Sequence, residues 1–224
     1  MIRNDCVRKV FTAMFALLAL GGSACAQEAA PEREAVLLVA HPGMIDPRFA
    51  ETVVLVTFPS DAGPMGVILN RPGPLEIRSL WPDRPERQKR DDRIFFGGPV
   101  QADGLLFVFR MSPPPEKAQW VMGDVYLSGD GALLDRLMAI PEPPVDQRFF
   151  AGYAGWAVGQ LEYEIEQGGW YVLQADLRVI FEMNALDMWE RMLQRATLPR
   201  TSLEKPCCAT EETERTERNA GMII

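Results

Sequence analysis

The chain has 224 residues, with 23 Lys and Arg against 31 Asp and Glu, which gives a formal net charge of −8. This acidity disfavours nucleic acid as a partner, because phosphate backbones repel a negative surface. The single histidine, His41, excludes a multi-histidine zinc site, and we expect neither a metal nor any other cofactor. The length fits one domain with tails.

Residues 1–26 are built like a cleavable secretory signal peptide. Three basic residues precede an apolar run over 11–20, and small residues follow, which predicts cleavage before Gln27. The apolar run is too short for a membrane-spanning helix, which needs ~20 apolar residues. We therefore expect a periplasmic or secreted protein with no stable membrane span once the signal is removed.

The cysteines leave two questions open. A lipid-modified Cys25 is a less favoured alternative to simple cleavage, because Gly22 stands where such signals carry a bulky aliphatic residue. Cys207 and Cys208 lie near the end of the chain, and the sequence does not assign them a role. Cleavage removes three basic residues and one acidic residue, so the mature chain has 20 basic and 30 acidic residues and a formal charge of −10.

After a polar linker (27–34), short strands and helices alternate irregularly over 35–198, and the polar residues 199–224 are typical of a disordered tail. The irregular order predicts a mixed α+β domain with a mainly antiparallel sheet. We expect helices over 75–81, 130–139, 161–167 and 186–196. We expect strands over 35–41, 51–58, 65–70, 94–96, 105–111, 125–127, 148–153 and 170–173.

Three motifs place glycine, polar or aromatic residues at strand ends. In the first, over 65–72, Asn70 tolerates a left-handed turn and Arg71 offers a planar fork that suits a carboxylate. A turn with a structural ion pair is the alternative interpretation. In the second, over 95–100, Gly97 and Gly98 allow a close backbone approach, or simply a tight turn in the sheet.

The third motif, over 152–162, is a strand that enters a helix through glycines, with Tyr153 and Trp156 between them. Free amides at such a helix start can hold an anion. Alternatively, the glycines let the helix pack flat on the sheet while Trp156 fills the core. Glu162 and Glu166 share a helix face, and like charges at that spacing usually indicate a solvated surface.

The sequence contains no recognised catalytic set, since the predicted domain has no cysteine, no nucleophile elbow and no phosphate-binding loop. We therefore favour a non-enzymatic binding or regulatory module with an unknown protein or a small anionic ligand as partner. The alternative is an enzyme with Arg71 as an anion clamp and Asp46 or Glu162 as acid or base. The sequence leaves the oligomeric state open.

The motifs together resemble the YqgE/AlgH family of bacterial proteins. Matching pieces, in family order, are residues 46–49, 65–72, 96–100 and 152–156 with 159–162. The resemblance implies a compact α+β fold with coiled, bifurcated sheets flanked by helices. It implies no agreed reaction and no catalytic residues, although one branch is linked by name to regulation of alginate production and a transcriptional role has been proposed.

The chain departs from this pattern in its export signal and in His41, which stands where a methionine is usual. Export makes direct gene regulation a poor fit. The candidate surface for a ligand or partner takes in the polar, glycine and aromatic residues of the matching motifs: Asp46, Arg48, Asn70, Arg71, Gly97, Gly98, Tyr153, Gly155, Trp156, Gln160 and Glu162.

Overall fold

The computed structural model describes residues 33–60, 62–83, 92–140 and 146–198. The predicted signal peptide, most of the predicted linker and the predicted tail with its two cysteines lie outside these ranges. Within them, no helix has the length and apolar character needed to cross a membrane.

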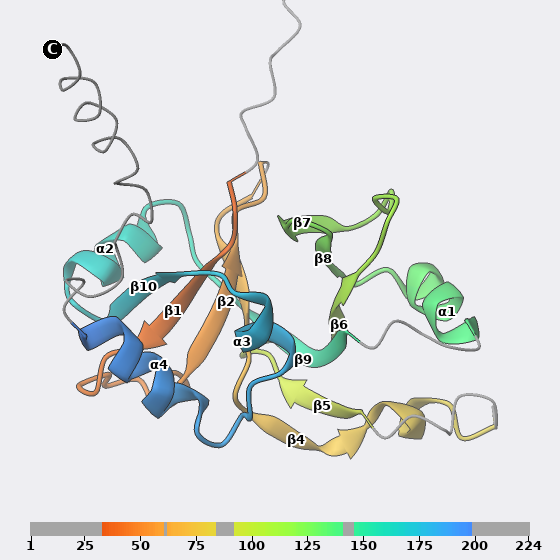
Figure 1. The fold of residues 1–224 in the computed structure, drawn as a ribbon, viewed down its shortest axis with the longest axis horizontal. Helices are drawn as coiled ribbons and strands as arrows, with labels where there is room; N and C mark the ends of the chain where they lie inside the picture. Colours follow the sequence, from red (N-terminus) through yellow and green to blue (C-terminus); the bar gives the residue numbers. More distant parts are fainter. Residues whose placement is uncertain (1–32, 61, 84–91, 141–145, 199–224) are drawn as a thin grey trace, which may run out of the picture. The chain divides into compact units, whose positions relative to one another are not determined.

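In the described part of the chain, ten strands form one sheet in the order β10-β1-β2-β3-β9-β6-β8-β7, with β4 paired to β5 and β5 to β9 (Figure 1). Only β5 and β9 pair in parallel; the other pairs are antiparallel. The strands are β1 (Val36–Ala40), β2 (Val53–Thr57), β3 (Met65–Ile68), β4 (Pro72–Glu76), β5 (Arg93–Phe96), β6 (Val100–Arg110), β7 (Gln119–Met122), β8 (Val125–Ser128), β9 (Gln147–Gly155) and β10 (Trp170–Gln174).

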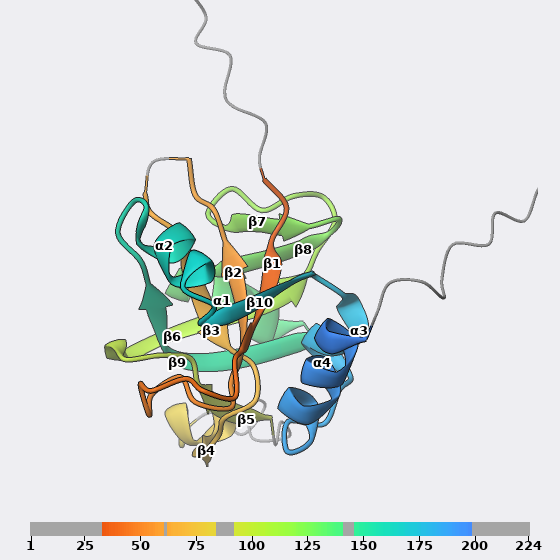
Figure 2. The same cartoon turned by 90° about the vertical axis from the view of Figure 1, so that its left-hand side faces the viewer.

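The sheet is strongly curled. The backbone N–H of Ala35, directly before β1, donates to the carbonyl of Val121 in β7 at 2.9 Å, although β7 is at the far end of the strand order. Figure 2 shows β6 and β9 crossing the direction of β1 and β2. A few helices accompany the sheet: α1 (Gly131–Ala139), α2 (Gln160–Glu166), α3 (Leu177–Phe181), α4 (Met188–Thr197) and a 3₁₀ helix (Ile77–Leu80). The α+β class with a mainly antiparallel sheet is confirmed.

Strand β1 is buried on both faces, which explains its uninterrupted apolar sequence. Leu37 and Val39 belong to a hydrophobic cluster that α3 and α4 cover. Leu38 and Ala40, on the opposite face, belong to a second cluster that contains Trp156, Leu161 and Trp170. The second cluster lies under α2 and supports the candidate site described below.

A third cluster, which we call the α1 cluster, forms where α1 packs beside β6, β8 and β9. Leu133 and Leu137 on α1 are buried there together with Phe107, Phe109 and Phe149. Helix α1 begins as predicted, because the Asp130 side chain accepts a hydrogen bond from the Leu133 amide at 2.7 Å and caps the helix.

The predicted helix over 75–81 is wrong in part. Residues 72–76 form β4, and only the 3₁₀ helix over 77–80 is helical, because Ile77 is drawn into the α1 cluster directly after the strand. The predicted strands on the two sides of the glycine turn after residue 96 are present as β5 and β6. These strands do not pair with each other, and both pair with β9. The prediction also missed β7 and α3, as well as the first half of β6.

Candidate functional site

Two adjacent cavities lie where the loop between β1 and β2 faces α2, and we call this pair of cavities the loop–α2 site. Their volumes are about 570 Å³ and about 250 Å³. Both are lined by Met44, Asp46, Glu164 and Trp170. The larger is also lined by His41, Gly43, Ile45, Tyr163, Gln167, Gly168 and Gly169, and the smaller by Arg48, Phe49, Pro99, Val100, Gly155, Trp156 and Gln160.

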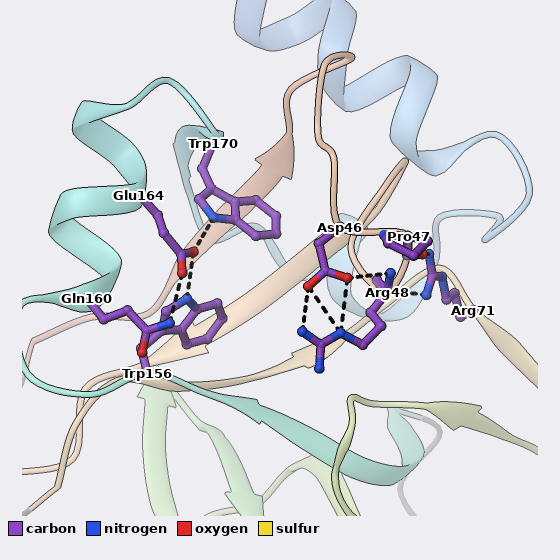
Figure 3. Close-up of polar contacts among 8 residues, drawn as sticks. All are labelled: Asp46, Pro47, Arg48, Arg71, Trp156, Gln160, Glu164 and Trp170. Atoms are coloured by element: carbon purple, nitrogen blue, oxygen red, sulfur yellow. Dashed lines mark hydrogen bonds and ion pairs between the residues drawn. The ribbon is translucent and has the colours of Figure 1, made fainter.

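Glu164 on α2 is one of two carboxylates that line both cavities, and its side chain points toward Trp156 and Trp170 (Figure 3). Its Oε2 accepts hydrogen bonds from the indole N–H of Trp156 at 3.0 Å and from that of Trp170 at 2.9 Å. Its Oε1 accepts from the Gln160 amide, one helical turn earlier on α2, at 2.9 Å. Three neutral donors therefore fix the position of this half-buried carboxylate.

The two indoles form part of an aromatic floor. Trp156 and Trp170 are 7% and 5% exposed, and their rings meet edge to face with centroids 6.4 Å apart. Phe49 from the loop packs against both rings, at 6.4 Å and 5.8 Å. Because the N–H groups of buried indoles need partners, Glu164 satisfies both of these donors.

The second carboxylate, Asp46, is paired inside its own loop. It accepts from the Arg48 amide at 2.9 Å and forms an ion pair with the Arg48 guanidinium at 2.6 Å. Hydrogen bonds from Arg48 hold the pKa of Asp46 below its usual value. The backbone turns here, since the amides of Phe49 and Ala50 both donate to the Asp46 carbonyl. Residues 47–51 thus form a turn and not a longer helix.

Asn70 and Arg71 line neither cavity, and both form hydrogen bonds with the backbone of the loop between β1 and β2 or of the residues next to it. The Asn70 side chain accepts from the Val53 amide and donates to the Glu51 carbonyl, both at 2.9 Å. The terminal nitrogens of Arg71 donate to the carbonyls of residues 47, 48 and 50. The fork expected to meet a carboxylate therefore binds backbone carbonyls of the loop, which removes the geometric basis for an anion clamp.

The glycine pair has a packing role. A Cβ on Gly97 would overlap the carbonyl of Gly152, and one on Gly98 would overlap the backbone of Tyr153. The connection from β5 to β6 therefore crosses β9 in direct backbone contact. The Tyr153 side chain packs into the cluster beneath α3 and α4, whereas Trp156 belongs to the cluster under α2.

The structure thus divides the predicted surface. Asp46, Arg48, Gly155, Trp156 and Gln160 line the loop–α2 site, and the other six do not. Glu162 is exposed on α2 outside the cavities. Trp156 is buried in the core, as the second interpretation of its motif predicts. The side chain of Gln160 accepts a hydrogen bond from the Ala157 amide at the start of α2, which is the position predicted for an anion.

Sequence reasoning missed Glu164, Trp170, Tyr163 and the loop residues Met44 and Ile45. The spacing of four between Gln160 and Glu164 was the available signal for one of them. His41 also lines the larger cavity; its Nδ1 accepts from the Gly43 amide at 3.0 Å, and its ring stacks on Tyr171. Within the described ranges, no three His, Cys, Asp or Glu side chains are grouped closely enough to hold a metal ion.

Comparison with known proteins gives consistent matches. The AlgH-like family model matches residues 37–200. A UPF0301 protein from Mycolicibacterium smegmatis is 35% identical over 175 residues, covering 76% of this chain and 86% of that protein. A UPF0301 protein from Mycobacterium tuberculosis is 34% identical over 173 residues, covering 75% and 84%.

Two solved structures share the fold. The solution structure of AlgH from Pseudomonas aeruginosa matches with a TM-score of 0.61 and 28% identity, covering 83% of this chain and 99% of that one. The crystal structure of a Corynebacterium diphtheriae protein matches with a TM-score of 0.59 over 77% of this chain and 90% of that one, and its 23% identity supports the fold alone. The chain belongs to the AlgH-like family of uncharacterised proteins.

Proposed function

We propose that the mature domain is a non-enzymatic binding module, exported to the periplasm or beyond, whose ligand occupies the loop–α2 site. The observation that carries the proposal is Glu164, a carboxylate held between two adjacent cavities by buried indoles. Cavities of ~300–1,000 Å³ with a few fixed polar groups are typical ligand sites, and the larger cavity has about 570 Å³.

Binding has more support than catalysis because the side chains on which the enzyme alternative relied either have protein partners or lie outside the site. Asp46 is bound by Arg48, and Arg71 is bound by loop carbonyls. A general acid or base needs access to the proton that it transfers. The enzyme alternative, which relied on Arg71 together with Asp46 or Glu162, has no such arrangement to support it.

The tryptophans offer a direct test. In the mature protein labelled with ¹⁵N, each indole N–H gives its own NMR signal, which Trp→Phe variants assign. We expect members of a fragment library of cations, neutral molecules and anions to shift the signals of Trp156 and Trp170. The signal of Trp120, which donates to the Gly123 carbonyl on the β7–β8 turn, should stay in place. Fragments that shift all of these signals alike, or none, would contradict a ligand site here.

Export is tested separately. In the native bacterium, we expect the mature chain to start at Gln27 and to fractionate with periplasmic or secreted proteins. Mass spectrometry of the intact protein from each fraction gives both answers. A chain that retains residue 1 and stays in the cytoplasmic fraction would contradict the proposed export. It would not contradict the proposal that the loop–α2 site binds a ligand.

A further inference from the structure

The charges that line the loop–α2 site are unbalanced. The charge of Asp46 is matched by Arg48, with which it forms an ion pair. Glu164 forms no ion pair with any residue in the described ranges, and its three donors are an amide and two indoles. Neutral donors stabilise a carboxylate but do not neutralise it. The site therefore presents one negative charge for which the described residues supply no counter-ion.

Glu164 also has room for one more partner. A carboxylate has about four acceptor positions. Both indoles use Oε2, and Gln160 alone uses Oε1. One acceptor position on Oε1 therefore has no donor among the described residues, and Glu164 lines both cavities.

Apolar surface surrounds this charge. Met44, Ile45, Tyr163 and Trp170 line the larger cavity with Glu164. Ile45 is 95% exposed and Tyr163 is 61% exposed, although both are large apolar or aromatic side chains. A ligand that lies between them would cover apolar area that water now contacts, and a cation next to an aromatic ring gains further attraction.

We infer that the ligand is an organic cation, an ammonium or guanidinium group on an apolar chain, whose charged end binds Glu164 while its chain lies between Ile45 and Tyr163. This inference rests on the proposed function and adds its ligand class. The charge of Glu164 disfavours the anionic ligand that the sequence suggested. A bare divalent cation fits less well, because a metal site needs several ligating side chains and the described ranges contain no such group.

Three probes of the same length separate charge from apolar contact: n-hexylammonium, 1-hexanol and hexanoate. Titrated into the ¹⁵N-labelled mature protein at low salt, hexylammonium should shift the indole signals of Trp156 and Trp170 at the lowest concentration. Hexanol should bind about tenfold more weakly, since it lacks the charge-assisted hydrogen bond, and hexanoate should bind least. Equal or tighter binding of hexanol or hexanoate would overturn the inference but leave the ligand site in place.

Glu164→Gln keeps the shape and removes the charge, and Glu166→Gln is the matched control on an exposed position of the same helix that lines neither cavity. We expect the first variant to weaken hexylammonium binding about tenfold and hexanol binding within about twofold. The second should leave both within about twofold. Unchanged hexylammonium affinity in Glu164→Gln would overturn the inference. The ranking of the three probes on the unmodified protein gives an answer even if that variant does not fold.

A free amine and the side chain of a lysine present the same chemistry. Comparing hexylammonium with N-acetyl-lysine methylamide separates these sources. Tighter binding of the lysine derivative would indicate a lysine of another protein, and tighter binding of hexylammonium a free amine. If neither shifts the two indole signals, the inference of a cationic ligand fails, while the fragment library still decides whether the cavities bind another class of molecule.

Discussion

The α1 cluster and the loop–α2 site use similar residues in opposite ways. In the α1 cluster, aromatic and aliphatic side chains are inside, and the charges around it pair at the surface, as Arg110 does with Asp124 and Asp146. At the loop–α2 site, Ile45 is exposed, while the Glu164 carboxylate is half-buried beneath the surface. The first arrangement stabilises a fold. The second leaves both charge and apolar surface unsatisfied, which is expected of a surface that contacts another molecule.

The largest expected effect lies in the α1 cluster. Leu137 is 0% exposed, and Leu137→Ala should lower the free energy of unfolding by about 2–5 kcal/mol, because it removes buried methyl groups and leaves a cavity. Urea unfolding measures the loss. Hexylammonium affinity, measured where the variant is folded, should not change; a change would mean that the two regions are coupled and the contrast between them is false.

Arg148 on β9 contacts Phe95 and Ile180, which belong to the cluster that α3 and α4 cover. Burial lowers the pKa of its guanidinium to about 10, so it stays charged at neutral pH. It donates to the carbonyls of Leu69 and Ile180 at 3.1 and 2.9 Å and lies over the ring of Phe95. Arg148→Lys should cost about 1–3 kcal/mol of unfolding free energy, because one ammonium cannot serve both carbonyls in this geometry. A loss of less than about 0.5 kcal/mol in the free energy of unfolding would show that the two-pronged guanidinium of Arg148 is not needed for stability.

Arg71 supports the site without lining it. Arg71→Gln should cost only about 1 kcal/mol of stability, yet it should speed hydrogen exchange at the amides of Phe49 and Ala50, whose turn Arg71 holds through the adjacent carbonyls. Hexylammonium binding should weaken as the loop loosens. Exchange measured by NMR at these two amides, with the Leu133 amide in α1 as reference, checks the effect; equal acceleration at Leu133 would indicate general destabilisation instead.

The exposed apolar residues should affect binding and not folding. Ile45→Ser should change the free energy of unfolding by less than about 0.5 kcal/mol, because the side chain is almost fully in water. The same variant should weaken binding of hexylammonium and hexanol equally, since both share the apolar chain. Val158→Ser, at another exposed position (91%) that lines neither cavity, is the control. A selective loss of hexylammonium binding would contradict the assigned role of Ile45.

The smallest effect concerns acid. Hydrogen bonds from Arg48 hold the pKa of Asp46 below 3.8 in the folded chain, so the pair adds stability above that pH and loses it as the pH falls through the lowered value. The difference in urea midpoint between the unmodified chain and Arg48→Gln should therefore be small at pH 7 and should shrink as the pH falls below the usual pKa of an aspartate. A difference that grows on acidification would contradict this assignment.

The sequence predicted two kinds of element: strands that are apolar throughout because both faces are buried, and helices whose start is marked by a nearby capping residue. The strands now seen as β1 and β2 read as apolar runs because both of their faces are covered, and Asp130 marked the start of α1. Glu164 was not found, because on a seven-residue helix it alternates with two other glutamates and only the fold brings the indoles of Trp156 and Trp170 to it. The role of Arg71 depended in the same way on a loop more than 20 residues away in sequence.

Strand β9 pairs with β3, β5 and β6, one of them in parallel, and each pairing fixes its register independently. Inserting or deleting one residue near Phe150 would turn every following side chain to the opposite face and would shift the pairing of β9 with all three strands. The strand thus has little freedom to change during evolution. The loop between β1 and β2 lies outside these ladders and supplies residues to both cavities. We therefore expect changes of length or sequence in that loop to alter what the loop–α2 site can bind while the sheet stays unchanged.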